Sequence, residues 1–409
     1  MISVSELLKL FNIILSLAIS EMKIRYPANR PSVVFAIMLY LVALFSYDIQ
    51  AQNRENIKTE KSHGPGLLYL QDAKGRNKLV RTKAEWKRKR QQILDSMQMV
   101  MGKIPDRSGL PSLNLQVTDS FKEKTYTRLT INFAVAKNER ISAYLYIPYQ
   151  KDTSKKLPAM VVLHGTGDPG KKLVDGESPL ANRAIAKELA QRGYVVIAPD
   201  YPSYGDLKDY DFDNDRYESG TMKGIFDHMR CVDLLQARKE VDAERIGVIG
   251  HSLGGHNAMF AGAFDKRLKV VVSSCGWTLF DDYDIGPQIS KEYGGRLGPW
   301  AQKRYMPLFL DKYKLDGSKI PFDFDEVIAA IAPRPFFSNS PLNDANFEVK
   351  GVIKGIAEAA KVYRFLKAEG NLQVRYPDAK HDFPPEVRLE AYRFIDRILK
   401  HTPCVDEIK

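Results

Sequence analysis

The stretch Arg245-Ile-Gly-Val-Ile-Gly-His-Ser-Leu-Gly-Gly255 decides the fold of this chain. Its short apolar run, 246–249, ends in the pattern G-x-S-x-G, with Ser252 as the central serine. That pattern places a serine on a sharp turn between a strand and a helix. The turn strains the backbone, and glycines at 250 and 254 let strand and helix approach each other closely. The stretch therefore predicts that Ser252 presents its hydroxyl at the carboxyl end of a strand.

Strands and helices alternate on both sides of this stretch. A helix is predicted from the serine to about residue 264. Further strands are predicted at 158–163, 194–198, 268–274, 334–338 and 372–376, and further helices at 180–192, 225–239, 352–368 and 385–400. A chain that alternates in this way forms a mostly parallel sheet with helices on both faces. Sites in such sheets lie at the carboxyl ends of the strands.

The chain before this alternation has a different pattern. Residues 127–134 and 141–147 read as antiparallel strands at one edge of the sheet. Thr82 begins a capping box with Glu85, and a helix follows as far as Met101. We expect an N-terminal helical extension at 52–112 and a catalytic domain at 113–403. A long insert, 276–324, follows the sixth predicted strand.

The first 51 residues resemble a targeting segment. Residues 31–47 carry no charge and consist mainly of apolar side chains. Three basic residues precede this run and a small residue follows it: Lys23, Arg25, Arg30 and Ala51. This order predicts a cleaved signal peptide and a secreted or periplasmic protein. Met22 would be a suitable start for it, with 1–21 as an upstream extension, and the alternative is a membrane anchor at 31–47.

Composition excludes several classes of protein. The chain has 409 residues, of which 44% are hydrophobic, so it can bury a large core. The formal net charge of +11 is dispersed, and no phosphate loop or nucleic-acid signature accompanies it, so we expect no nucleic-acid partner. Three cysteines, Cys231, Cys275 and Cys404, lack the spacing of disulfide frameworks or metal sites. We expect no metal and no organic cofactor, and the oligomeric state stays open.

A serine hydroxyl needs a base, and that base needs an acid to hold its tautomer. In this kind of sheet the order along the chain is serine, acid, histidine. Asp344 follows the predicted strand 334–338, and His381 follows the predicted strand 372–376. We therefore predict a catalytic triad of Ser252, Asp344 and His381.

Other residues compete for these roles. His251 and His256 flank the serine, where neither faces its hydroxyl in line, and His164 is expected to have a structural role. The competing acids are Asp378, Asp382 and Glu348, and Glu348 is the best reserve.

The oxyanion of the tetrahedral intermediate needs preorganised hydrogen-bond donors. We predict the backbone N–H of Leu253, at the start of the helix, and that of Thr166 in the loop Gly165–Thr166.

With these residues in view, the chain resembles the α/β-hydrolase superfamily, in its acetyl xylan esterase-like and dienelactone hydrolase-like branch. The resemblance covers roughly 83–400 and is specific at 241–257, 332–335, 341–344 and 381–385. It implies an α/β-hydrolase fold and the same three residues as nucleophile, acid and base. Many members of that branch act on acyl groups of plant polysaccharides.

Taken together, these patterns predict a serine carboxylesterase that hydrolyses short esters, with acetyl groups on carbohydrates favoured, through an acyl-enzyme. Feruloyl and uronic-acid methyl esters stay open. For contacts with substrate we predict Trp277 and Trp300 in the insert and Tyr201 after the strand 194–198. The alternatives are a serine peptidase of the prolyl oligopeptidase type and a non-catalytic glycan-binding protein on a hydrolase scaffold. Too few residues precede the sheet for the propeller of such a peptidase, and a binding protein has no need of a triad.

Overall fold

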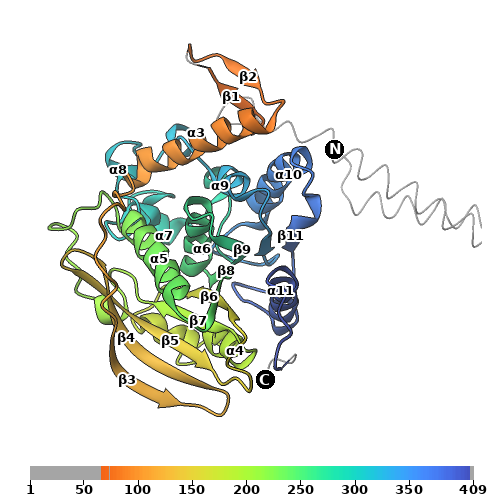
Figure 1. Cartoon of the computed structure of the whole chain (residues 1–409). Helices are drawn as coiled ribbons and strands as arrows, with labels where there is room; N and C mark the ends of the chain where they lie inside the picture. Colours follow the sequence, from red (N-terminus) through yellow and green to blue (C-terminus); the bar gives the residue numbers. More distant parts are fainter. Residues whose placement is uncertain (1–65, 73, 406–409) are drawn as a thin grey trace, which may run out of the picture. The chain divides into compact units, whose positions relative to one another are not determined.

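A nine-stranded β-sheet lies at the centre of the computed structural model, which describes residues 66–72 and 74–405 (Figure 1). In chain order its strands are β3 (Gln116–Lys122), β4 (Tyr126–Ala136), β5 (Glu139–Pro148), β6 (Leu157–Leu163), β7 (Val195–Pro199), β8 (Val241–His251), β9 (Leu268–Ser274), β10 (Phe336–Asn339) and β11 (Leu372–Arg375). Their order across the sheet is β11-β10-β9-β8-β6-β7-β5-β4-β3. The strands from β11 to β7 are parallel, and β5, β4 and β3 continue the sheet in antiparallel pairs. The predicted mostly parallel sheet with an antiparallel edge is confirmed.

Helices cover both faces of the sheet (Figure 1). They are α4 (Ile185–Gln191) and α11 (Pro385–Ile398) on one face, and α5 (Gly220–Ala237), α6 (Leu253–Phe264), α9 (Phe324–Ile331) and α10 (Val349–Phe365) on the other. Successive side chains of a strand point to opposite faces. In β6, Val161 belongs to the larger apolar core under α5 and α6, whereas Met160 and Val162 belong to the smaller core under α4 and α11. The central parallel strands β6 and β7 consist of apolar residues because both of their faces are buried.

The N-terminal part of the described chain consists of a small hairpin and a long helix. Strands β1 (Tyr69–Gln71) and β2 (Asn77–Leu79) pair in antiparallel fashion, and α3 (Lys83–Met101) follows them. The predicted capping box is present: Thr82 Oγ1 accepts the N–H of Glu85, and the Glu85 side chain accepts the N–H of Thr82. Arg90 on α3 donates to the carbonyl groups of Ala330 and Ala263, which ties this helix to α9 and α6. The domain boundary at 112 stays a prediction.

The structure corrects the start of one predicted helix and the number of strands that precede the insert. The helix predicted at 180–192 begins only at Ile185, because Asn182 has a φ of 62° and its side chain, like that of Arg183, donates to Asp382. Strand β3 was not predicted separately, so the insert follows the seventh strand of the sheet in chain order instead of the sixth. The side chains of β3 are exposed along its whole length, which removes the alternating apolar pattern that marks a strand.

The insert 276–324 has a local structure of its own. It contains α7 (Pro287–Glu292), α8 (Leu308–Asp311) and the 3₁₀ helices η3 (Phe280–Asp282), η4 (Gly298–Ala301) and η5 (Gly317–Lys319). Aromatic rings pack at its centre, with the Phe280 ring 5.1 Å from Phe309 and 6.0 Å from Trp300. Other 3₁₀ helices, η1 (Gly170–Asp175), η2 (Gly205–Leu207) and η6 (Glu369–Asn371), lie in loops of the main fold. The insert is therefore a packed element whose aromatic centre continues the larger apolar core.

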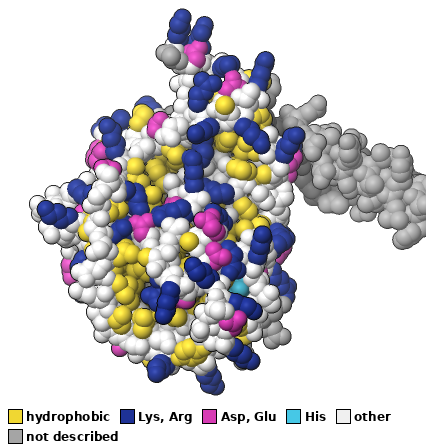
Figure 2. Space-filling model, in the orientation of Figure 1, with side chains coloured by type: hydrophobic (Ala, Val, Ile, Leu, Met, Phe, Trp, Pro, Cys, Tyr) yellow, Lys and Arg dark blue, Asp and Glu magenta, His cyan; other side chains and the backbone are white. Residues whose placement is uncertain are grey.

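Basic side chains are spread over the face of the molecule in Figure 2, with acidic and apolar side chains between them. The predicted targeting segment at 1–51, and the alternative anchor at 31–47, lie outside the described residues. Within 66–72 and 74–405, no helix combines the length and the apolar character needed to cross a membrane.

His228 on α5 makes stability depend on pH. The side chain is buried, neither ring nitrogen has a hydrogen-bond partner among the described residues, and burial lowers its pKa from 6.5 to about 3. The folded protein holds the ring neutral, whereas the unfolded chain takes up a proton below pH 6.5. Proton uptake therefore favours the unfolded chain, and the free energy of unfolding decreases as the pH falls. Between about pH 7 and about pH 5 the free energy of unfolding should fall by about 2 kcal/mol through His228. Urea denaturation of wild type and His228→Leu checks this, and equal losses in both proteins would contradict it.

Candidate active site

The turn at Ser252 has the strained geometry that its glycines indicate. Strand β8 ends at His251, α6 begins at Leu253, and Ser252 between them has φ 56° and ψ −122°. A Cβ atom on Gly250 would lie 2.1 Å from the carbonyl oxygen of Gly254, and a Cβ atom on Gly254 would lie 2.0 Å from that of Leu163. The Ser252 N–H donates to the carbonyl of Ser274 at 2.8 Å, which fixes the turn to the end of β9. The strand, the helix and the loop after β6 therefore meet with no room for side chains at 250 and 254.

Asp344 and His381 come together at the same edge of the sheet. Asp344 lies in the loop after β10 and His381 in the loop after β11. His381 Nδ1 lies 2.9 Å from Asp344 Oδ1 and 3.0 Å from Oδ2. The Asp344 side chain is only 2% exposed, and its Oδ1 also accepts the backbone N–H groups of Asn346 and Phe347. This carboxylate can hold the proton of His381 on Nδ1, which leaves Nε2 free to act as a base.

The other histidines near the serine have different partners. His251 Nδ1 lies 2.9 Å from Ser274 Oγ, and His256 Nδ1 lies 3.2 Å from the carbonyl of Gly276. His164 is fully buried, and its ring stacks on Tyr201 at 3.8 Å between centroids. Burial lowers the pKa of His164 to about 4 and that of His256 to about 3, and it moves the pKa of His251 well below its ordinary value. All three rings are therefore neutral, whereas the side chain of His381 is 21% exposed.

The competing acids point elsewhere. The carboxylate of Asp382 accepts hydrogen bonds from Arg183 and Asn182. Asp378 accepts the side-chain amide of Asn343 at 2.7 Å. Glu348 is exposed at the start of α10. Of the acids weighed from the sequence, Asp344 is the one that the structure pairs with His381.

The loop after β6 lies directly against the serine. A Cβ atom on Gly165 would meet the carbonyl oxygen of His251 at 3.4 Å and the Cβ of Ser252 at 3.6 Å. Tyr201 donates its hydroxyl to the carbonyl of His164 at 2.8 Å, and this bond holds the start of the loop. The N–H of Leu253 belongs to the first turn of α6, where backbone N–H groups have no acceptor within the helix. Thr166 and Leu253 line the same cavity as Ser252, so both residues predicted to supply oxyanion donors border the space into which the serine opens.

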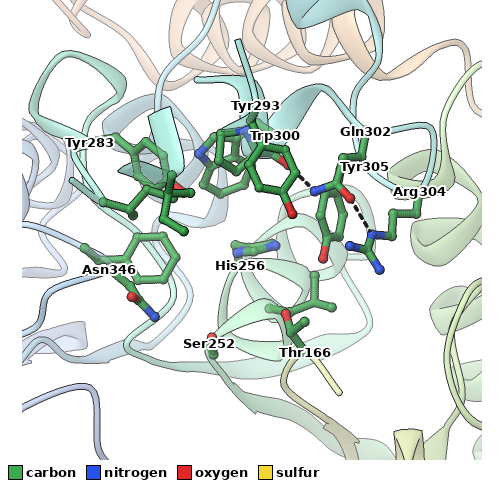
Figure 3. A pocket seen from close by; sticks show the side chains of 15 residues that line it. Thr166, Ser252, His256, Tyr283, Tyr293, Trp300, Gln302, Arg304, Tyr305 and Asn346 are labelled. Carbon is green, nitrogen blue, oxygen red and sulfur yellow. Dashed lines mark hydrogen bonds between the residues drawn. The ribbon is translucent and has the colours of Figure 1, made fainter. Parts of the chain in front are cut away.

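Ser252 opens into a cavity of about 340 Å³ (Figure 3). The insert supplies one wall, and Ser252 and Thr166 lie on the opposite side. The lining consists of Thr166, Ser252, Leu253, His256, Tyr283, Ile285, Ile289, Tyr293, Pro299, Trp300, Gln302, Arg304, Tyr305, Asn346 and Phe347. The cavity thus combines aromatic rings with a small number of polar groups, which is typical of a binding site for a small organic molecule.

The structure brings only one of the three predicted substrate contacts to this cavity. Trp300 lines it, whereas Trp277 and Tyr201 are not among the described residues that do. Trp277 is 1% exposed, donates its indole N–H to Ser338 Oγ at 3.0 Å and leaves no room for a Cβ on Gly355. Trp277 and Tyr201 therefore belong to the buried core and not to the described lining of the cavity. Sequence reasoning missed Gln302, Arg304 and Asn346, because no local pattern marks a polar residue of an irregular insert or loop as lining a cavity.

One group of possible metal ligands lies in the described part of the chain. It consists of Cys275, Asp344 and His381, whose ligand atoms all lie within 4.8 Å of one another. Burial, and then the charge of Asp344, raise the pKa of the Cys275 thiol well above its ordinary value. Because a metal binds the thiolate, this protonated thiol is a poor ligand. The group is better explained as the hydrogen-bonded pair of Asp344 and His381 beside a buried thiol.

Comparisons with known proteins match this chain to carbohydrate esterases. Residues 107–281 match the family model of acetyl xylan esterases, and residues 210–367 match that of fungal glucuronyl esterases. The hydrolase YtaP of Bacillus subtilis is 28% identical over 311 residues, which cover 73% of this chain and 96% of YtaP. The 4-O-methyl-glucuronoyl methylesterase of Hypocrea jecorina is 27% identical over 242 residues, or 56% of this chain and 48% of that protein. Among solved structures, the glucuronoyl esterase of Solibacter usitatus superposes with a TM-score of 0.62 at 21% identity, covering 82% of this chain and 97% of that one.

Proposed function

Since the chain belongs to the α/β-hydrolase superfamily, in the branch that contains acetyl xylan and glucuronoyl esterases, we propose that it hydrolyses carboxylic esters of carbohydrates with Ser252 as nucleophile. The observation that carries the proposal is the hydrogen bond of His381 to both oxygens of Asp344, at the sheet edge where Ser252 opens into a cavity. An imidazole oriented by a buried carboxylate is the base that a serine hydroxyl requires.

The reaction proceeds in two steps. Ser252 Oγ attacks the ester carbonyl while its proton passes to His381 Nε2, and Asp344 stabilises the imidazolium that forms. The tetrahedral oxyanion accepts the N–H groups of Leu253 and Thr166. His381 then gives its proton to the departing alcohol oxygen, which leaves an acyl group on Ser252. Water attacks this acyl-enzyme with His381 again as base, and the carboxylic acid is released.

A carbohydrate uronoyl ester is the substrate that we now favour over the acetyl ester expected from the sequence. The acetyl xylan esterase match ends at residue 281, before most of the cavity wall. The glucuronyl esterase match, 210–367, spans the insert, Asp344 and every described lining residue except Thr166. The wall holds the rings of Tyr283, Tyr293, Trp300 and Tyr305, and such rings can pack against the apolar face of a sugar. Export from the cytoplasm remains part of this proposal and rests on the pattern of residues 1–51.

An assay on four substrates tests the proposal. The purified protein should hydrolyse p-nitrophenyl acetate and the benzyl ester of glucuronic acid, with the higher kcat/KM on the glucuronate ester. Acetylated xylan should be the poorer carbohydrate substrate, and a prolyl peptide should not be cleaved. Cleavage of the peptide would favour the peptidase alternative, and binding without turnover of any ester would favour a non-catalytic glycan-binding protein.

Replacement of Asp344 by asparagine should lower kcat by a factor on the order of 10³–10⁴. The amide can donate to Nδ1, which favours the tautomer that carries its proton on Nε2 and cannot accept from Ser252. Glu348→Gln is the matched control, because it neutralises the reserve acid that the sequence offered. If Glu348→Gln lost more activity than Asp344→Asn in steady-state assays, the assignment of the acid would be wrong.

A further inference from the structure

Arg304 is the only residue with a permanently charged side chain among the fifteen described residues that line the cavity. None of these described lining residues is an aspartate or a glutamate. His256 adds no charge near neutral pH, because burial lowers its pKa to about 3. The electrostatic potential that the lining itself produces is therefore positive.

Among the described residues, the partners of Arg304 provide no counter-ion for this charge. Its Nε donates to Gln302 Oε1 at 3.0 Å, and its guanidinium lies over the rings of Tyr204 and Tyr305, at 5.5 and 5.3 Å from their centroids. In the described part of the chain, no carboxylate forms an ion pair with it. The neighbouring Lys303, by contrast, is exposed and pairs with Asp213.

The guanidinium is also held in one orientation. Gln302 donates its amide to the carbonyl of Pro299 at 2.9 Å, so that its oxygen faces Arg304 (Figure 3). This bond uses only Nε, and the two terminal nitrogens of the fork remain for a ligand. A guanidinium fork is suited to bidentate hydrogen bonding with carboxylate and related oxyanions. Because the orientation is set in advance, binding loses less side-chain entropy.

From this charge and orientation we propose that Arg304 binds an anionic group of the substrate, a carboxylate or a sulfate, that is separate from the ester cleaved at Ser252. The substrate is then an acidic carbohydrate ester. The inference rests on the proposed function for the position of the scissile ester. Neutral hydroxyl groups of a sugar explain the presence of Arg304 less well than an anion does. Asn346, Gln302 and the tyrosines already offer uncharged hydrogen-bonding groups to such hydroxyls. A partly desolvated cation, by contrast, forms its strongest hydrogen bonds with an anion.

A binding experiment tests the anion site without relying on catalysis. Isothermal titration calorimetry would compare trigalacturonate, a sulfated neutral trisaccharide and uncharged xylotriose on wild type, Arg304→Gln and Lys303→Gln. Wild type should bind at least one charged trisaccharide about 10- to 100-fold more tightly than xylotriose, and Arg304→Gln should lose that preference. Lys303→Gln removes the same charge one residue away and should keep it. The two charged probes distinguish a carboxylate from a sulfate as the ligand.

Arg304→Lys provides a second variant, which keeps the charge without the fork and should retain part of the preference. Melting temperatures report whether each variant folds, and the salt dependence of binding to wild type gives a readout that needs no variant. Equal affinity of wild type for charged and uncharged trisaccharides would overturn the inference, and so would equal losses in Arg304→Gln and Lys303→Gln.

Kinetics separate this inference from the proposed function. On partly methyl-esterified trigalacturonate, Arg304→Gln should raise KM about 10- to 100-fold and change kcat little, whereas Lys303→Gln, outside the described lining, should leave both KM and kcat close to wild type. If esters are hydrolysed but Arg304→Gln affects charged and neutral substrates alike, the anion site is wrong and the hydrolase stands. If wild type hydrolyses no ester but binds the charged trisaccharides through Arg304, the proposed function is wrong and the anion site stands.

Discussion

Replacement of Ser252 by alanine is expected to lower kcat for ester hydrolysis by a factor on the order of 10⁴–10⁶. The variant loses the oxygen that forms the acyl-enzyme, so His381 and Asp344 have no nucleophile to activate. The oxyanion donors and the cavity remain, and they account for the residual rate over uncatalysed hydrolysis. Steady-state kinetics with p-nitrophenyl acetate and benzyl glucuronate measure the loss.

Ser203→Ala is the matched control for this change. Ser203 also has a positive φ, 77°, and it lies outside the lining of the cavity. Its replacement therefore removes a hydroxyl from a similarly strained turn and should leave kcat within about threefold of wild type. Ester turnover by Ser252→Ala at a rate close to that of wild type would refute the mechanism.

Replacement of Gly254 by alanine should destabilise the fold by about 3 kcal/mol or more and also abolish activity. The new Cβ would lie 2.0 Å from the carbonyl oxygen of Leu163 and 2.7 Å from that of His164. Both contacts are with backbone atoms of β6 and the loop that follows it, which cannot turn aside as a flexible side chain can. Relief requires α6 to move away from β6, and this movement shifts Ser252 relative to Thr166.

Denaturant unfolding followed by circular dichroism measures this effect. Gly370→Ala is the control, because a Cβ there would have no atom within 4 Å and should change the free energy of unfolding by less than about 0.5 kcal/mol. If both glycine variants were as stable as wild type, the close approach of α6 and β6 would not be needed for folding.

Local sequence patterns were enough to predict most of the helices and strands of the fold. The run 268–274 and the helix that follows Ser252 were predicted with almost the bounds that the structure gives them, because a short apolar run indicates a buried strand and the G-x-S-x-G pattern places a helix directly after its serine. The start of α4 and the strand β3 were missed. At α4 a contact between segments 200 residues apart in sequence overrides helix propensity, and at β3 an edge strand lacks the apolar alternation that reveals a strand.

The sequence by itself determined where the reacting groups of the candidate site lie. A serine between glycines, an aspartate after one strand and a histidine after another fall at one edge of a parallel sheet, because the carboxyl ends of parallel strands share that edge. The tertiary structure alone decided what surrounds them. Trp277 and Trp300 belong to the same insert, yet one lies in the core and the other lines the cavity. Irregular segments have no period, so the direction of each side chain there, including that of Arg304, depends on packing between segments distant in sequence.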